Sequence, residues 1–264
     1  MPEGLEIELY RRAAEAALDR EIADVTVPVG AFVRNGSVAA LGDALIGQRF
    51  GRARRRGKLL LLDTAHAEGV TLGLRFGMTG RLIVDDDAII EQLEYSSGRN
   101  DEAWDRLIVD FVDGGSLRVR DQRRLGSAEL DPDEDELGVD LFDVTGADLT
   151  RILGASTRPL KSRLMDQAQI AGLGNLLTDE ILWRASLDPE RPANGLDAAD
   201  RRRLLHHLRR TVRFLLERGG SHMGDLQDQR HPDGRCPRDG APLRRCTVGG
   251  RTTYACPDHQ RAQD

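Results

Sequence analysis

The chain has 264 residues and a net charge of −6, with 39% apolar and 31% charged residues. This length is too great for one small core and suits two or three domains, and the composition is that of a globular protein. No apolar run approaches the ~20 residues of a transmembrane helix, so we expect no membrane anchor. The three cysteines lie close together near the end of the chain, which is not a disulfide framework and favours the reducing cytoplasm.

The charges are unevenly distributed along the chain. Basic residues gather at 52–58, at 118–124 and from residue 201 onwards, and most of them are arginines. Clustered arginines suit bidentate contacts with phosphate groups, which favours a nucleic-acid partner despite the negative total. The alternative is a codon bias towards arginine that produces solvated charged faces.

The first six residues read MPEGLE. They are not a secretory signal, because two glutamates stand where basic residues belong. Removal of Met1 would leave Pro2 with a free secondary amine, and the ordinary pKa of an α-amino group, about 8, allows a neutral and nucleophilic fraction. Glu3 and Glu6 are near enough to act as proton donor and acceptor. The alternative is an ordinary start followed by a helix.

Residues 3–20 are predicted to form an amphipathic helix, because apolar side chains recur at Leu5, Leu9 and Ala13. A helix with one buried face would hold the terminal amine in place, as a catalytic group requires.

The region 22–120 is predicted to be rich in β-strands. Short apolar runs lie at 22–27, 59–62, 70–74, 82–84, 107–111 and 116–119. Asp113-Gly114-Gly115 marks a hairpin, and a short helix capped by Ser37 interrupts the strands at 37–45. Several short strands at this spacing predict a β-sandwich or a barrel.

Three segments of this region carry candidate functional side chains. Lys58 stands at the start of a leucine-rich strand, after three arginines, as a compact charge suited to a phosphate. The glycine-bounded loops 75–80 and 121–126 offer Met78 and Leu125, which could insert into a stack of bases. The alternative for both residues is packing in the core.

An acidic stretch at 131–136 is predicted to be a linker, and helical periodicity follows it. Gly172 and Gly174 precede Asn175, which starts a helix to about residue 185. The free N–H groups at this helix start suit a phosphate. A long helix is predicted from a cap at Asp197 to residue 218.

The tail contains two Cys-Pro turns separated by a hairpin, in the frame of a zinc ribbon. Asp239 and His259 stand where the second cysteine of each turn is expected, and Cys246 or His231 is an alternative ligand. The predicted zinc ligands are Cys236, Asp239, Cys256 and His259. A metal-free hairpin stabilised by its own packing is the other prediction.

These motifs resemble the formamidopyrimidine-DNA glycosylase/endonuclease VIII family. They are the Met-Pro-Glu start with Glu6, Arg-Arg-Gly-Lys before a leucine run, Gly-Met-Thr-Gly, Asp-x-Arg-Arg-x-Gly, Ala-Gly-Leu-Gly-Asn and the Cys-Pro hairpin. The resemblance spans nearly the whole chain and implies an α+β multidomain fold. The implied domains are a two-layer β-sandwich with an N-terminal helix (1–130), a helix-two-turns-helix domain (131–222) and a zinc-ribbon-like hairpin (223–264).

The resemblance also implies roles for individual residues. Pro2 matches the nucleophile that forms a Schiff base, Glu3 the general acid/base, Glu6 a pocket residue, and Lys58 a lysine that contacts phosphate beside the lesion. The implied DNA contacts, to phosphates or within the gap left by the everted base, are Arg75, Met78, Arg123, Lys161, Asn175 and Arg251. The implied partner is damaged double-stranded DNA, and the implied cofactor is Zn²⁺.

The function implied is that of a bifunctional DNA glycosylase and abasic-site lyase. Such an enzyme excises an oxidised base through its terminal proline and cleaves the strand by β-elimination, with δ-elimination as a further step. One alternative is a non-catalytic binder of damaged or abasic DNA on the same scaffold. Another is a generic two-domain protein with a metal hairpin. We expect a monomer in the cytoplasm, associated with the nucleoid.

The chain departs from the family pattern at several places. Leu125 stands where many members of the formamidopyrimidine branch carry Phe, Arg75 replaces a common His, and Gln122 replaces a common Pro. The segment 220–236 is short. Its shortness, together with Gly4 at the start of the chain, favours the oxidised-pyrimidine branch or an atypical subfamily.

Overall fold

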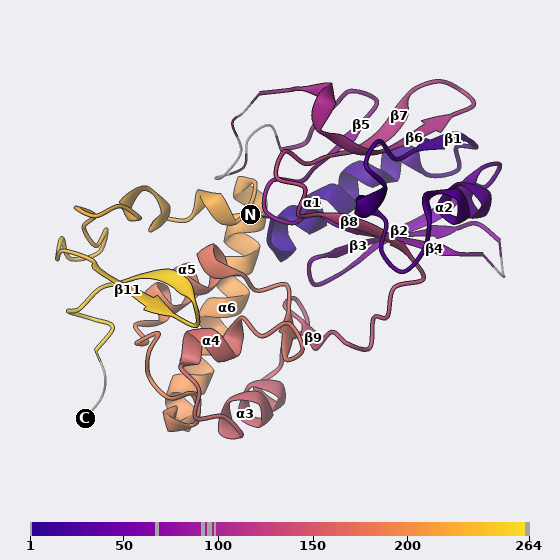
Figure 1. Ribbon diagram of the computed structural model, residues 1–264. Helices are drawn as coiled ribbons and strands as arrows, with labels where there is room; N and C mark the ends of the chain where they lie inside the picture. Colours follow the sequence, from indigo (N-terminus) through magenta and orange to yellow (C-terminus); the bar gives the residue numbers. More distant parts are fainter. Residues whose placement is uncertain (1, 67–68, 91–92, 94–96, 98, 262–264) are drawn as a thin grey trace. The chain divides into compact units, whose positions relative to one another are not determined.

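The structure is a computed structural model that describes residues 2–66, 69–90, 93, 97 and 99–261. It contains two compact units (Figure 1). The first unit comprises Pro2 and residues 6–134, and the second comprises residues 3–5 and 135 onwards. The predicted domain limits at 130/131 and 222/223 remain predictions, since the contacts group the helices and the terminal hairpin together.

The first unit contains two antiparallel four-stranded sheets, with strand orders β1-β6-β7-β5 and β2-β3-β4-β8. The strands are β1 (Ile22–Thr26), β2 (Phe50–Arg56), β3 (Leu59–Thr64), β4 (Thr71–Arg75), β5 (Arg81–Val84), β6 (Asp105–Phe111), β7 (Ser116–Arg120) and β8 (Ser127–Leu130). The helices are α1 (Gly4–Ala14), which starts in the second unit, and α2 (Val38–Leu45).

A single apolar core joins both sheets of the first unit. Leu60 and Leu72 from one sheet belong to the same buried cluster as Val109 and Val119 from the other. Alternate side chains of each strand are thus buried between the layers. This arrangement confirms the predicted two-layer sandwich.

Two strands of the first unit were not predicted from the sequence. Residues 50–56 form β2, which pairs with β3 so that Arg54 lies opposite Leu61. β2 stands at the edge of its sheet, where charged side chains are compatible with a strand. β8 has no apolar run and is held by its pairing with β4.

The limits of the predicted helices were partly right. The Ser37 side chain accepts a hydrogen bond from Ala40 N and caps α2, as predicted. The N-terminal helix is shorter than predicted, because α1 ends at Ala14 and a 3-10 turn follows. Asp19 then adopts a left-handed conformation, and its N–H donates to the Phe50 carbonyl as the chain enters the sheets.

The second unit consists of helices and two small sheets. The helices are α3 (Gly146–Gly154), α4 (Leu160–Leu164), α5 (Asn175–Ala185) and α6 (Ala198–Arg218). The strands are β9 (Val139–Asp140), parallel to β10 (Ile170–Ala171), and the terminal hairpin β11 (Arg244–Val248) and β12 (Arg251–Ala255). Short 3-10 turns complete both units: η1 (Glu15–Ala17), η2 (Gly30–Phe32), η3 (Glu102–Trp104), η4 (Ala193–Gly195), η5 (Ser221–Met223) and η6 (Gln227–Gln229).

The long helix α6 has the predicted ends. The Asp197 side chain accepts a hydrogen bond from Asp200 N at its start, and Gly219 ends it in a left-handed conformation with φ 106°. Its buried leucines join a core that includes Leu5. A separate small cluster packs Trp183 of α5 against Tyr254 and Cys256 of the hairpin region. No helix in the described part of the chain combines the length and hydropathy needed to cross a bilayer.

Candidate functional site

Glu3 is fully buried in the second unit, where its carboxylate caps α5. Its Oε1 accepts a hydrogen bond from Leu176 N at 2.8 Å, and its Oε2 accepts one from Leu177 N at 3.1 Å. These are the first free N–H groups of α5, at the end of the helix where the backbone dipoles favour a negative charge. The contact fixes the orientation of a carboxylate one residue after Pro2.

Gly174 makes room for this carboxylate. A Cβ atom at position 174 would lie 2.2 Å from Glu3 Cδ, a distance that no side chain tolerates. The neighbouring backbone reinforces the contact, because Gly4 N donates to the Gly172 carbonyl at 2.9 Å. The two glycines predicted to allow a tight turn thus also bring the N-terminal segment onto α5.

The predicted phosphate seat at the start of α5 requires a correction. The backbone N–H groups of Leu176 and Leu177 bind the Glu3 carboxylate, so they are not available to a phosphate. The side chain of Asn175 remains a candidate, since its enclosed Oδ1 meets no hydrogen-bond donor among the described residues.

Glu6 lies in the first unit, buried on α1 one turn before Tyr10. The Tyr10 hydroxyl donates to the Gly80 carbonyl at 3.1 Å and so connects α1 with the loop 75–80. Burial, followed by the negative charge of Glu6, raises the pKa of Tyr10, which keeps the hydroxyl protonated as a donor.

The loops 75–80 and 121–126 are joined by one buried acid, Asp121. Its Oδ1 accepts from Thr79 Oγ1 at 2.5 Å, and its Oδ2 accepts from the N–H groups of Leu125 and Gly126 at 2.7 and 2.8 Å. The loops also touch at Gly77, whose φ is 56° and where a Cβ would lie 2.5 Å from the Leu125 carbonyl carbon. The two loops therefore form one rigid surface.

This surface presents the side chains that were predicted to insert into DNA. Leu125 is 47% exposed, so its alternative assignment to the core is wrong. Arg123 is exposed and Met78 is half-buried. Insertion of these side chains into DNA remains a prediction.

Lys58 and Arg75 lie elsewhere in the first unit. Lys58 is half-buried in the turn between β2 and β3, beside Gly57 with its φ of 56°. Arg75, at the end of β4, forms an ion pair with Glu129 at 3.2 Å. Contacts of either residue with phosphate remain predictions.

Lys161 of α4 is fully buried, in contrast to what a phosphate ligand requires. Its Nζ pairs with Asp179 Oδ1 at 2.7 Å and donates to Thr253 Oγ1 at 2.7 Å and to the Thr252 carbonyl at 3.3 Å. Arg230 pairs with the other oxygen of Asp179. Burial lowers the pKa of Lys161, opposed by Asp179. This cluster connects α4 and α5 with strand β12 and favours a structural role.

Arg251 is exposed at the start of β12 and lines a groove of about 540 Å³ within the second unit. Arg158, which precedes α4, lines the same groove, and the Oγ of Ser162 is enclosed there without a described hydrogen-bond partner. Two arginines, one hydroxyl and the single acid Asp166 form a surface suited to a phosphate group.

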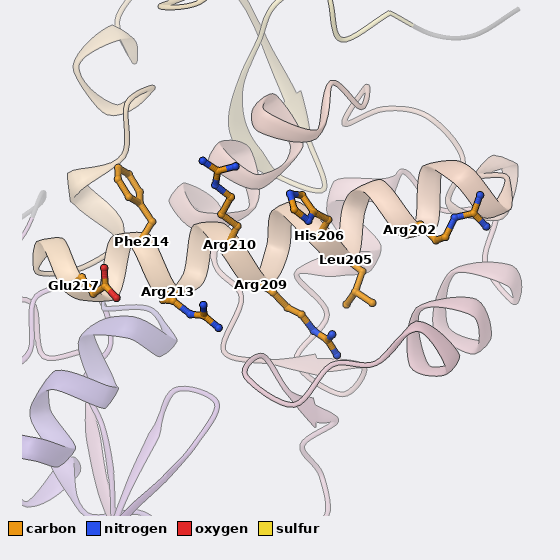
Figure 2. A pocket seen from close by; sticks show the side chains of 8 residues that line it. All are labelled: Arg202, Leu205, His206, Arg209, Arg210, Arg213, Phe214 and Glu217. Atoms are coloured by element: carbon orange, nitrogen blue, oxygen red, sulfur yellow. The ribbon is translucent and has the colours of Figure 1, made fainter.

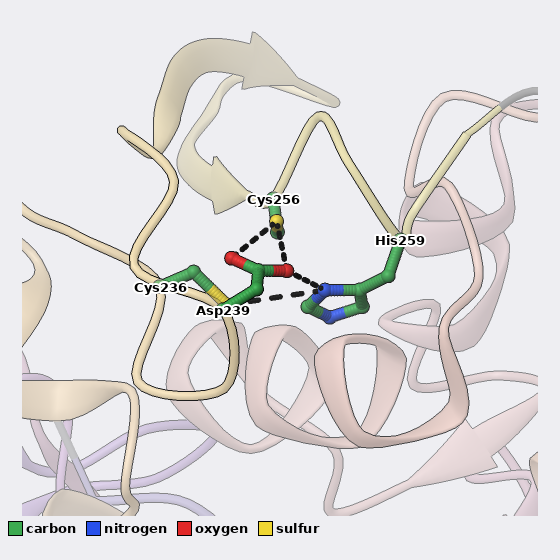
Figure 3. A group of neighbouring side chains, drawn as sticks. All are labelled: Cys236, Asp239, Cys256 and His259. Carbon is green, nitrogen blue, oxygen red and sulfur yellow. Dashed lines mark hydrogen bonds and ion pairs between the residues drawn. The ribbon is translucent and has the colours of Figure 1, made fainter.

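The four predicted metal ligands come together at the base of the hairpin. Ligand atoms of Cys236, Asp239, Cys256 and His259 all lie within 4.8 Å of one another, and Figure 3 shows them converging from two turns. His259 Nδ1 lies 2.7 Å from Asp239 Oδ2, and Cys256 Sγ lies 3.2 Å from the same oxygen. Cys246 and His231 are not among the grouped residues.

The donor set of this cluster fits a zinc ion. Two sulfurs, one imidazole nitrogen and one carboxylate oxygen supply four ligands of types that Zn²⁺ accepts. The hydrogen bond with His259 lowers the pKa of Asp239, whereas burial raises the pKa of Cys256 to about 11. Trp183 Nε1 donates to Cys236 Sγ at 3.3 Å, a contact that orients this thiol from α5.

Sequence reasoning missed four residues that organise these sites. Thr79 and Asp121 fix the paired loops, while Asp179 and Arg230 surround Lys161. Asp121 belongs to a recognised motif but had no assigned role. A buried acid cannot be distinguished from a solvated one by residue type alone, since its burial depends on distant partners.

Comparison with family models gives two matches. Residues 1–128 match the model described as formamidopyrimidine-DNA glycosylase N-terminal domain, and residues 137–226 match the formamidopyrimidine-DNA glycosylase H2TH domain. Together these ranges contain the N-terminal segment, both paired loops and the start of α5. The terminal hairpin lies outside them.

Curated relatives cover the whole chain. A formamidopyrimidine-DNA glycosylase of Nocardioides sp. is 33% identical over 99% of this chain and 95% of its own length. One from Methylobacillus flagellatus is 31% identical over 100% and 98%. Among solved structures, Lactococcus lactis Fpg (MutM) with N7-benzyl-Fapy-dG DNA has a TM-score of 0.82 at 25% identity, covering 99% of this chain and all of that one. The same protein with abasic-site DNA has a TM-score of 0.81 at 25% identity, covering 98% and 100%.

Proposed function

Because the chain belongs to the formamidopyrimidine-DNA glycosylase family of base excision repair, we propose that it excises oxidised bases and cleaves the strand at the resulting abasic site. The nucleophile is the secondary amine of Pro2 after removal of Met1. The partner is damaged double-stranded DNA, as in the Lactococcus lactis complexes with Fapy-dG and abasic-site DNA. The protein acts as a monomer on chromosomal DNA in the cytoplasm.

The capped carboxylate of Glu3 is the observation that carries this proposal. General acid–base catalysis needs a titratable group held at a fixed position beside the reacting atoms. The two hydrogen bonds from Leu176 and Leu177 provide that position directly after Pro2. A carboxylate whose only task was helix capping would not need to follow the terminal proline.

The reaction proceeds by covalent catalysis. The Pro2 nitrogen attacks C1′ of the everted nucleotide, the C1′–N bond to the base breaks, and the departing base takes up a proton. The Glu3 carboxylate accepts the proton that the Pro2 amine loses and passes it to the ring oxygen O4′ as the sugar opens, which leaves an iminium between Pro2 and C1′. Loss of a C2′ proton then breaks the bond from C3′ to its phosphate oxygen. Water finally hydrolyses the iminium and frees Pro2.

The contacts with DNA divide between phosphate and base. We assign backbone phosphates to Lys58 and to the groove of Arg251, because phosphate contacts position a protein on the duplex. Met78, Arg123 and the exposed Leu125 lie on the paired loops and fill the gap left by the everted base. Since a leucine is smaller than the phenylalanine common in the family, we expect weak discrimination of the opposite base.

We further propose that the cluster at the base of the hairpin binds one Zn²⁺. When bound, zinc supplies folding energy to a hairpin that has a small apolar core of its own. Cys236 and Cys256 would bind as thiolates, with His259 and Asp239 completing the set. The hairpin carries Arg251, so its order supports the phosphate groove.

Borohydride trapping tests the proposed nucleophile. Mature protein is mixed with duplex DNA containing one abasic site, and sodium borohydride reduces the iminium to a stable adduct. We expect an adduct with the wild type and a much lower yield with Pro2→Gly, whose terminus is a primary amine without the proline ring, with DNA affinity retained in the variant. A wild type that binds the abasic duplex but forms no adduct would establish the non-catalytic binder instead.

A further inference from the structure

The exposed face of α6 carries a row of arginines that the proposed repair chemistry does not use. Arg202, Arg209, Arg210 and Arg213 are all exposed, on the side of the helix opposite its buried leucines. At 1.5 Å per residue, this row extends over about 17 Å. Figure 2 shows these side chains projecting from α6 together with His206 and Phe214.

These four arginines differ from Arg203 and Arg218 of the same helix, which both have an acidic partner. Arg203 pairs with Asp200 at 2.6 Å, and Arg218 pairs with Asp225 at 3.4 Å. In the described part of the chain, no ion pair involves the four arginines of the row, and Arg209 donates only to the Val144 carbonyl. Adjacent like charges destabilise a helix, so an unpaired row indicates an anionic partner from outside the chain.

The row lines a groove of about 670 Å³ that also has apolar walls. Leu205 and Phe214 line it, and Glu217 lies at one end. The guanidinium groups of Arg184 and Arg218 each lie 4.8 Å from the centre of the Phe214 ring. Burial, and then the positive charges of His206 and nearby arginines, lowers the pKa of His207 on the same helix.

We propose that this groove binds an acidic peptide segment of a partner protein, with aspartate or glutamate side chains on the arginines and separate apolar side chains against Leu205 and Phe214. The volume lies within the range of about 300–1,000 Å³ of ligand sites. A DNA backbone would gain nothing from the apolar walls. None of the residues that line the groove has a part in the proposed lesion chemistry.

Fluorescence anisotropy tests the proposal with a fluorescein-labelled peptide of six aspartates followed by two leucines. We expect salt-sensitive binding to the full-length protein, and about tenfold or greater weakening in the double variant Arg209→Gln/Arg213→Gln. The matched control Arg12→Gln/Arg151→Gln also removes two exposed positive charges, outside the groove, and should bind like the wild type. Peptides with asparagine for aspartate, or serine for leucine, should each bind at least about tenfold more weakly.

Three outcomes would overturn the proposal. They are no binding of the aspartate-leucine peptide at about 1 mM, equal weakening in the two double variants, and equal binding of the asparagine peptide. Loss of affinity for undamaged duplex DNA in Arg209→Gln/Arg213→Gln, with peptide binding unchanged, would assign the groove to nucleic acid instead. Borohydride trapping on abasic DNA should be equal in both double variants, which separates this test from that of the lesion chemistry.

Discussion

In the proposed function, Glu3 combines a catalytic role with the structural contact to α5. In Glu3→Gln, one side-chain oxygen remains a hydrogen-bond acceptor and the other is replaced by an NH₂ group. This NH₂ group is a donor, so it cannot accept a hydrogen bond from Leu176 N or Leu177 N. We expect excision of an oxidised base to fall by about 100-fold or more, because the proton donor is lost. Affinity for abasic DNA should be retained.

The exposed Glu15→Gln provides a control with the same change of charge and should excise like the wild type. Single-turnover excision and anisotropy with abasic duplex are the measurements. Equal losses of excision and binding in Glu3→Gln would contradict the role assigned to Glu3.

Gly174 provides a test of the same contact from the opposite side. In Gly174→Ala, the new methyl group would meet Glu3 Cδ at 2.2 Å, so the carboxylate must leave the end of α5. We expect a loss of about 1–3 kcal/mol in unfolding free energy together with a strong loss of excision. Gly154→Ala on α3 is the matched control, because nothing lies within 4 Å of its added Cβ. Wild-type excision by Gly174→Ala would show that the position of Glu3 is not critical.

At the scale of elements, the buried Lys161 connects helices α4 and α5 with the terminal hairpin. Lys161→Met leaves Asp179 with Arg230 alone and removes the hydrogen bond to Thr253. We expect a loss of about 3–5 kcal/mol in unfolding free energy, as for other broken buried pairs. Thermal and urea unfolding measure this loss. An unchanged unfolding midpoint combined with weaker DNA binding would support the phosphate contact that the family resemblance implies.

Helix α1 is stabilised by a pH-dependent group of charges around Glu8. Burial alone would raise the pKa of Glu8, but hydrogen bonds from Arg11 and Arg12 and the charge of Arg55 lower it below its ordinary value of 4.5. The stabilisation is therefore fully present above pH 4.5 and is lost as the pH falls through the lowered pKa.

Glu8→Gln should consequently reduce the unfolding free energy by about 1 kcal/mol at pH 7 and by much less at pH 3. Thermal unfolding of both proteins between pH 3 and 7 checks the trend. Asp43→Asn on α2 is the control for removal of an exposed negative charge outside this group. A constant effect of Glu8→Gln over this range would show that its ion pairs contribute nothing.

Element by element, the sequence was informative where local chemistry decides the structure. The Ser37 and Asp197 caps, the end of α6 at Gly219 and most apolar strands follow from short-range patterns. Strand β2 could not be predicted in this way, because its sequence is rich in arginine and lacks an apolar run. It forms a strand because it pairs with the leucines of β3. The contacts of Glu3, Lys161 and Asp121 could not be predicted from the sequence either, since they depend on how the chain folds.

At the scale of the whole molecule, the net charge is −6. A protein with this charge can bind DNA only if its basic residues are concentrated where it contacts the phosphates. We expect affinity for abasic duplex to fall about 10³-fold or more between 50 and 200 mM salt, as counterions are released from several phosphates. Arg251→Ala should reduce the slope of log K against log salt by about one. Arg12→Gln, on α1, should leave the slope unchanged. A flat salt response of the wild type would argue against a DNA-binding surface.

The capping of α5 by Glu3 also has a consequence for synthesis on the ribosome. The residues that receive this carboxylate lie 173 and 174 positions later in the chain. While the first unit is being translated, the segment 3–5 has no place to dock. The carboxylate proposed as the general acid and base therefore acquires its fixed position only when the helical region has emerged, and a nascent or prematurely terminated chain lacks this contact.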